Sequence, residues 1–162
     1  MAGHVSATKH ATFTLERNFA HPVSRVFGLL SDPDKKRRWL IDDAGTTVKR
    51  FDMDFRVGGH EVGEYFIKKG SPVDGMPFVN DSVFFDIVPD QRVIMGQTMS
   101  IAGGRISVAL ITFALAATDS GTQLTITHQG TFLEGADGPE MREGGWKALM
   151  NKIAAAADEI AP

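Results

Sequence analysis

The sequence has no cysteine among its 162 residues. This absence excludes disulfide bonds, thiolate catalysis and zinc sites built on cysteine, and it fits a reducing compartment. No apolar run approaches the roughly 20 residues that span a bilayer. Residues 1–12 also lack the hydrophobic segment of a secretion signal. We therefore expect a cytoplasmic protein with no membrane insertion and a flexible N-terminus over residues 1–12.

An excess of positive charge is also absent, because the formal net charge is −3 at pH 7. A domain that binds duplex nucleic acid usually shows a basic face. The one basic run, Lys35-Lys36-Arg37-Arg38, would point in four directions on a helix. We interpret this run as a solvated helix face and predict no nucleic-acid partner.

Motifs for catalysis and metal binding are scarce. The chain has no Gly-x-Ser-x-Gly elbow, the motif that carries the nucleophile of many hydrolases. Gly58-Gly59 is followed by neither a lysine nor a helix start, so it is not a phosphate loop. Acidic residues are frequent between 42 and 64, but their spacing marks no metal site. We predict no metal and no cofactor.

The hydrophobic pattern indicates one α+β domain over residues 13–162. Alternating apolar residues predict a first strand over 11–20, and Pro22 suits the first turn of a helix. Asp32 can cap a second short helix that ends at Trp39. Alternation and turn residues then predict six more strands, near 46–54, 59–68, 82–89, 92–101, 105–117 and 121–131.

The connections and the C-terminal segment complete the expected architecture. Short links between successive strands predict an antiparallel meander. Segment 70–81 contains two prolines and two glycines, and we expect it to be a mobile loop. Residues from Pro139 to Ile160 predict a helix about 33 Å long, with an apolar stripe that includes Trp146 and Met150.

Several ordered fragments carry a family resemblance. They are Asp32-Pro33 leading to Trp39, Asp54-Phe55-Arg56-Val57-Gly58-Gly59, Gly121-Thr122 before Leu124–His128, and Gly144-Gly145-Trp146. Their order and spacing resemble the START-like, Bet v 1-like superfamily, and within it the homologues of the activator of heat-shock protein 90 ATPase. The resemblance implies a helix-grip fold, in which about seven strands curve around the long C-terminal helix, and an apolar cavity between them.

We expect this cavity to be lined by side chains of the sheet and the helices. The expected lining residues are Trp39, His60, Phe84, Met95, Phe113, Ile126, His128, Trp146 and Met150. His128 shares a strand face with Leu124 and Ile126, so it should point inward. It is also the best candidate for a catalytic residue, although a core histidine hydrogen-bonded to a neighbour has the same pattern. His60 follows a double glycine that can shift the alternation, and Tyr65 should face the side opposite to His60.

Three functions fit this arrangement. The first is a binding module for an apolar or amphipathic small molecule, and the second is a cyclase-type or hydrolase-type enzyme that uses His128. The third is a chaperone-associated interaction domain that works through its surface. A second polar group beside His128 would favour the enzyme, and an apolar cavity would favour binding. We favour binding over catalysis and leave open whether the protein forms a homodimer.

Overall fold

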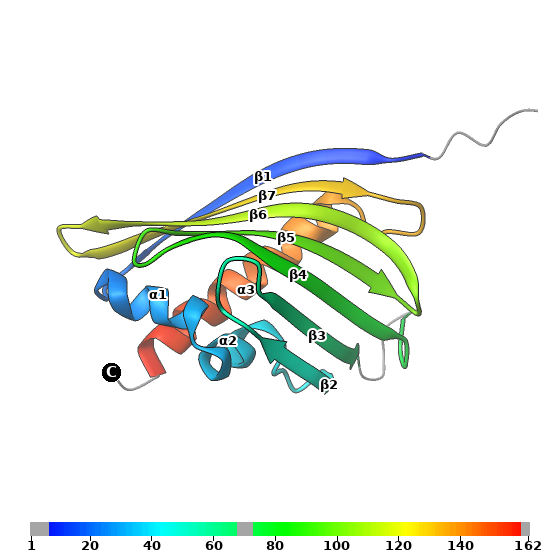
Figure 1. The fold of residues 1–162 in the computed structure, drawn as a ribbon, viewed down its shortest axis with the longest axis horizontal. Helices are drawn as coiled ribbons and strands as arrows, with labels where there is room; N and C mark the ends of the chain where they lie inside the picture. The colour runs from blue at the N-terminus through cyan, green and yellow to red at the C-terminus, as the bar shows by residue number, and fades with distance from the viewer. Residues whose placement is uncertain (1–6, 68–72, 160–162) are drawn as a thin grey trace, which may run out of the picture.

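The computed structural model describes residues 7–67 and 73–159, which form seven strands and three helices (Figure 1). The elements are β1 (Lys9–Phe19), α1 (Val23–Ser31), α2 (Pro33–Leu40), β2 (Thr46–Met53), β3 (His60–Ile67), β4 (Pro77–Val88), β5 (Arg92–Ile101), β6 (Gly104–Thr118), β7 (Gly121–Phe132) and α3 (Pro139–Glu159). This order confirms the predicted α+β class and the two short helices after the first strand.

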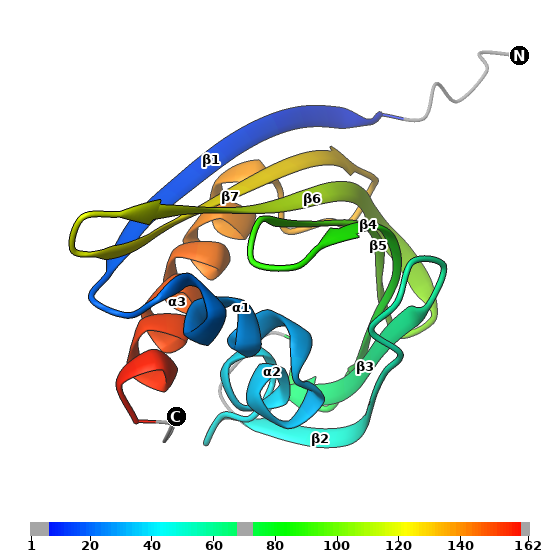
Figure 2. The same cartoon turned by 60° about the vertical axis from the view of Figure 1, so that its left-hand side comes forward.

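All seven strands belong to one antiparallel sheet with the order β1-β7-β6-β5-β4-β3-β2. From β2 to β7 each strand pairs with the next one in sequence, which confirms the meander. The sheet curves strongly, and all three helices lie on its concave side (Figure 2). This arrangement confirms the helix-grip fold.

The two short helices are separated by a single capping residue. The Asp32 side chain accepts hydrogen bonds from the backbone N–H groups of Asp34 and Lys35, at 3.0 and 3.1 Å. This is the N-cap that the sequence predicts for α2. The indole Nε1 of Trp39 donates to the carbonyl of Leu29 at 2.8 Å, which fixes α2 against α1.

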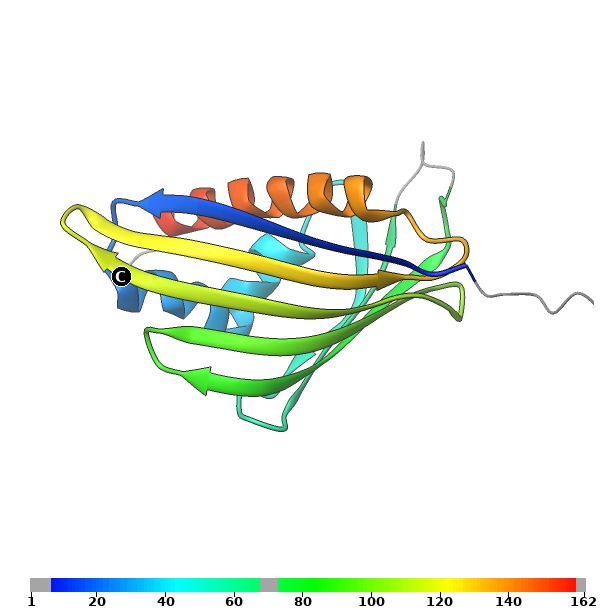
Figure 3. The same cartoon turned by 90° about the horizontal axis from the view of Figure 1, so that it is seen from above.

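The long helix α3 runs beside β1 and contacts both short helices (Figure 3). From Trp146 onwards its inward side is apolar, with Trp146, Met150, Ile153 and Ala157 buried. This confirms most of the predicted apolar stripe. None of the described helices is long and apolar enough to cross a membrane.

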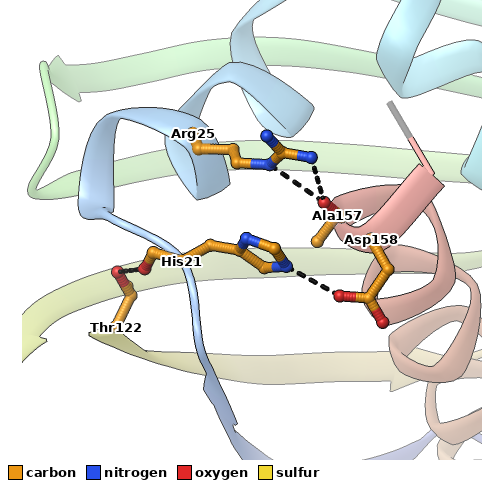
Figure 4. Close-up of polar contacts among 5 residues, drawn as sticks. All are labelled: His21, Arg25, Thr122, Ala157 and Asp158. Atoms are coloured by element: carbon orange, nitrogen blue, oxygen red, sulfur yellow. Dashed lines mark hydrogen bonds and ion pairs between the residues drawn. The ribbon is translucent and has the colours of Figure 1, made fainter. Parts of the chain in front are cut away.

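The last turn of α3 is held by residues at and just before α1 (Figure 4). The guanidinium of Arg25 donates twice to the carbonyl of Ala157, at 2.9 and 2.7 Å. His21 Nε2 lies 2.7 Å from Asp158 Oδ1, and Thr122 Oγ1 donates to the His21 carbonyl at 2.8 Å. These contacts occupy one of the helix carbonyls that lack an intrahelical partner.

Two predicted boundaries are wrong. β1 begins at Lys9, so residues 9–12 pair with β7 instead of belonging to a flexible terminus. β4 begins at Pro77 rather than near 82, because a proline is tolerated at the first residue of a strand. The predicted mobile loop over 70–81 therefore includes five strand residues, and its part up to residue 72 lies outside the described residues.

The Gly58-Gly59 motif forms the tight connection between β2 and β3. Gly58 has a φ of +81°, and a Cβ on Gly59 would lie 2.0 Å from the carbonyl oxygen of Asp54. Gly58 N–H also donates to the carbonyl of Phe84 at 2.8 Å. Arg56 pairs with Asp54 at 2.8 Å. The motif has a structural role, since its backbone closes the turn and joins it to β4.

Candidate functional site

The concave face of the sheet brings most of the predicted cavity residues together. Eight of the nine are buried in the interior: Trp39, Phe84, Met95, Phe113, Ile126, His128, Trp146 and Met150. Trp39 is buried in the core, where it packs its helix against α1. The apolar members form a single cluster that joins the sheet to α3.

His60 is the exception, and its predicted place in the cavity is wrong. Its side chain is 60% exposed, and Nδ1 lies 3.3 Å from Asp81 Oδ1 on the convex side. The double glycine lies in the turn before β3, and the strand alternates regularly after it. The inward position is therefore taken by Glu61, and Tyr65 lies on the face opposite to His60 as predicted.

His128 lies at the centre of the interior and is fully buried. Its ring is parallel to that of Phe13, with the centroids 4.8 Å apart, and the rings of Phe132 and Trp146 lie at 6.2 Å. Neither ring nitrogen has a hydrogen-bond partner among the described residues. No side chain among the described residues is therefore the neighbour that a hydrogen-bonded core histidine would have.

The surroundings of His128 favour the neutral imidazole. Burial is the main cause that lowers its pKa to about 4, and the positive charge of Arg142 adds to the effect. A Cβ on Gly130 would lie 2.8 Å from Cε1 of His128 and 3.0 Å from Cε2 of Phe132. Gly130 therefore provides the space that these two rings occupy.

A buried ion pair joins α2 to the sheet. Lys36 Nζ lies 2.5 Å from Glu61 Oε2, and both side chains are at most 4% exposed. The ammonium also lies 5.4 and 5.8 Å from the ring centroids of Phe84 and Phe113. The interpretation of the basic run as a solvated face is therefore wrong for Lys36. Its position three residues before the buried Trp39 was the available signal, because such residues share a helix face.

A second buried cation lies near the start of α3. Arg142 donates to both carboxylate oxygens of Asp137, at 2.8 and 2.7 Å, and to Ser107 Oγ at 3.0 Å. Its guanidinium carbon lies 5.2 Å from the ring centroid of Phe132. Sequence reasoning missed Arg142, although its spacing of four residues from Trp146 places it on the same side of the helix.

The interior thus has paired charges and unpaired polar atoms. Both buried cations have a carboxylate partner, whereas Asn80 Oδ1, Glu61 Oε2 and both His128 ring nitrogens have no hydrogen-bond partner among the described residues. Glu61 Oε2 touches the Lys36 ammonium but not at a hydrogen-bonding angle. No group of three metal-ligating side chains occurs in the described part of the chain. The arrangement can hydrogen-bond a guest molecule within apolar walls.

Comparisons with known proteins agree with this fold. A protein from Rhizobium loti has 38% sequence identity and a TM-score of 0.82, and the match covers 93% of this chain and 99% of that one. An uncharacterised protein from Rhizobium leguminosarum has 29% identity and a TM-score of 0.87, with 96% and 99% covered. The AHSA1-like protein from Aeromonas hydrophila, at 18% identity and a TM-score of 0.66, covers 91% and 92% and shares the fold.

No protein with a curated description matches the sequence significantly. The family model described as "Activator of Hsp90 ATPase homolog 1-like protein" matches residues 20–158. This match spans α1 to the end of α3 and so includes the whole concave face except β1. The chain therefore belongs to the family of Activator of Hsp90 ATPase homolog 1-like proteins, within the Bet v 1-like superfamily.

Proposed function

We propose that this protein binds a neutral, amphipathic small molecule between the concave face of the sheet and α3. The observation that carries the proposal is the pair of unpartnered ring nitrogens of His128. Buried polar groups in native proteins are nearly always hydrogen-bonded to protein, water or ligand. An imidazole among the rings of Phe13, Phe132 and Trp146 therefore needs a partner from outside the chain.

The chemistry of the unpaired atoms indicates which ligand fits. Asn80 Oδ1 is an acceptor, and neutral His128 offers one acceptor and one donor. These groups suit hydroxyl or amide hydrogens on the guest. An anion would find no free buried cation among the described residues, because Lys36 is paired with Glu61 and Arg142 with Asp137. We therefore expect hydroxylated or amide-bearing apolar molecules rather than fatty acids.

Catalysis by His128 is supported less well. A general base works best when its pKa is near the operating pH, whereas burial lowers the pKa of His128 to about 4. Among the described residues no carboxylate hydrogen-bonds to the ring to orient it. Binding requires only a neutral hydrogen-bonding ring, which this environment provides.

The proposal includes an interior volume of about 300–1,000 Å³, the usual range of ligand pockets. Native mass spectrometry of the freshly purified protein tests it directly. We expect a co-purified small molecule, or tight uptake of a neutral apolar dye such as Nile red. Protein that carries no adduct and takes up neither dye nor alcohol would contradict the proposal.

A matched pair of competitors tests the ligand class. Decanol and decanoate have the same chain length and differ in charge at pH 8. We expect decanol to displace Nile red at a concentration at least about tenfold lower than decanoate, since burying an uncompensated carboxylate is strongly unfavourable. Equal displacement, or a preference for decanoate, would show that the interior offers a free cation.

A further inference from the structure

A hollow lies on the convex face of the sheet, opposite the helices. It is a shallow groove of about 490 Å³ over β3 to β6. Its lining consists of His60, Asp81, Val83, Phe85, Gly96, Gln97, Thr98, Arg105, Val108, Ala109 and Leu110. Three large apolar side chains in it are exposed, Phe85 by 57%, Val108 by 45% and Leu110 by 38%. Contiguous exposed apolar surface of this kind marks an interaction site more often than single exposed residues do.

A β-bulge and a glycine create this surface. The register between β4 and β5 shifts between Phe84 and Asp86, so Phe85 has no partner opposite it. Its ring lies over Gly96, where a Cβ would come within 2.5 Å of Phe85 Cε2. Bulges redirect a side chain locally, and here the bulge places an aromatic ring on the sheet surface.

We propose that the convex groove is the interface of a homodimer, with a two-fold axis that runs along β5 between the two sheets. Such an axis places β4 of each copy opposite β6 of the other copy. The register aligns Val83, Gly96 and Leu110 across β4, β5 and β6. Leu110 of each copy therefore faces Val83 of the other, and the two Phe85 rings meet near the axis.

The charges beside the groove complement one another under the same symmetry. Asp81 lies on β4 in register with Thr98 and Val108, so the axis brings it over Val108 of the second copy. Arg105 occupies the next convex position of β6, paired with Ser100. That position is about 7 Å along the strand, within reach of an arginine side chain. Each dimer would thus contain two ion pairs between Arg105 and Asp81, one on either side of the axis and both level with Thr98 to Ser100 of β5.

A charge exchange tests this geometry. Sedimentation equilibrium should show a dimer of the wild type forming between about 10 µM and 1 mM, a weak association that suits a small interface. Arg105→Glu and Asp81→Lys should each raise the dissociation constant at least about fivefold. The double variant should return it to within about twofold of wild type, because the pair is restored in reverse. Arg38→Glu, an exposed charge change on α2, is the control and should have no effect.

The apolar centre has its own test. Phe85→Ser should abolish the dimer, whereas Met141→Ser, at a methionine of α3 that is 68% exposed, should leave it intact. Circular dichroism melts establish that both variants are folded. A wild type that stays monomeric at 1 mM, or a dimer that tolerates Phe85→Ser or either single charge reversal, would overturn the proposal. Because the groove is on the outer face, these outcomes are independent of ligand binding inside.

Discussion

The imidazole of His128 lies flat against the ring of Phe13, with centroids 4.8 Å apart and ring planes at 4° to each other. The pairing of β1 with β7 produces this stack, because it sets the two residues directly opposite each other. The ring is therefore held in the apolar interior, where the charged form is disfavoured. This relationship has a consequence for the dependence of stability on pH.

We expect His128 to destabilise the fold in acid. Its pKa is lowered from 6.5 to about 4 in the folded protein, so below pH 6.5 the unfolded chain binds a proton that the folded one does not. The free energy of unfolding is then fully retained above pH 6.5 and falls as the pH drops towards 4. The loss from this group is on the order of 2–3 kcal/mol.

Urea unfolding of the wild type and His128→Gln at pH 7 and pH 4 measures this effect. The variant has no titrating ring. Between pH 7 and pH 4 its free energy of unfolding should therefore fall by about 2–3 kcal/mol less than that of the wild type. The protonation of all other groups affects the stability of both proteins equally. Parallel pH profiles for the two proteins would contradict the buried, neutral His128.

Substitution of His128 also separates binding from catalysis. Glutamine keeps a similar size and both hydrogen-bonding functions, so His128→Gln should bind Nile red or decanol within a few fold of wild type. His128→Leu removes the polar atoms, and we expect its affinity for decanol to fall about 5–100-fold. An activity that the wild type shows and His128→Gln lowers by roughly 10²–10⁴-fold, with binding unchanged, would instead indicate proton transfer.

Trp146 should contribute strongly to stability. It is buried on α3, with its ring 6.0 Å from Phe113 and 6.2 Å from His128. Trp146→Ala should lower the free energy of unfolding by about 3–5 kcal/mol, the usual cost of a large aromatic truncation in a core. Met141→Ala, on the same helix but exposed, should change it by less than about 0.5 kcal/mol. Similar losses for both variants in denaturant melts would mean that α3 does not pack as described.

Two glycine-to-alanine changes should have opposite effects. Gly130→Ala places a methyl group within 2.8 Å of the His128 ring, and overpacking of this kind costs about 1–3 kcal/mol. Gly144 lies in α3, and beyond its neighbours and the backbone of its own helix no atom lies within 4 Å of an added Cβ. Gly144→Ala should therefore stabilise the protein by up to about 1 kcal/mol through helix propensity. Thermal melts of both variants measure these changes in stability. No loss of stability in Gly130→Ala would show that the rings of His128 and Phe132 can move aside.

The buried pair of Lys36 and Glu61 should be costly to break from one side only. Lys36→Met leaves Glu61 buried without a cation, and we expect a loss of about 3–5 kcal/mol. The double variant Lys36→Met/Glu61→Gln removes both charges and should recover most of that stability. The coupling free energy from this double-mutant cycle is the measurement. If the losses of stability from the two single substitutions simply add, at least one of the two charges is exposed to water and the pair is not buried.

The sequence by itself determined the fold class, the order of elements and most of the core. Periodicity was sufficient for this, because alternation and helical spacing show which side of each element is apolar. It placed His128, Phe84 and Trp146 inward, and the structure confirms all three. It also indicated the Asp32 cap and the turn at Gly58-Gly59, since these depend on local backbone chemistry.

Tertiary structure alone decided the polar contents of the interior and the character of the convex face. Lys36 and Arg142 share helix faces with Trp39 and Trp146, but only the partners Glu61 and Asp137 make the burial of their charges tolerable. Glu61 lies 25 residues from Lys36 along the chain, and no local pattern shows that the two meet. His60 was misplaced because its side depends on how the preceding turn closes. Long-range contacts of this kind depend on the curvature and register of the sheet, which arise only when all the strands pair.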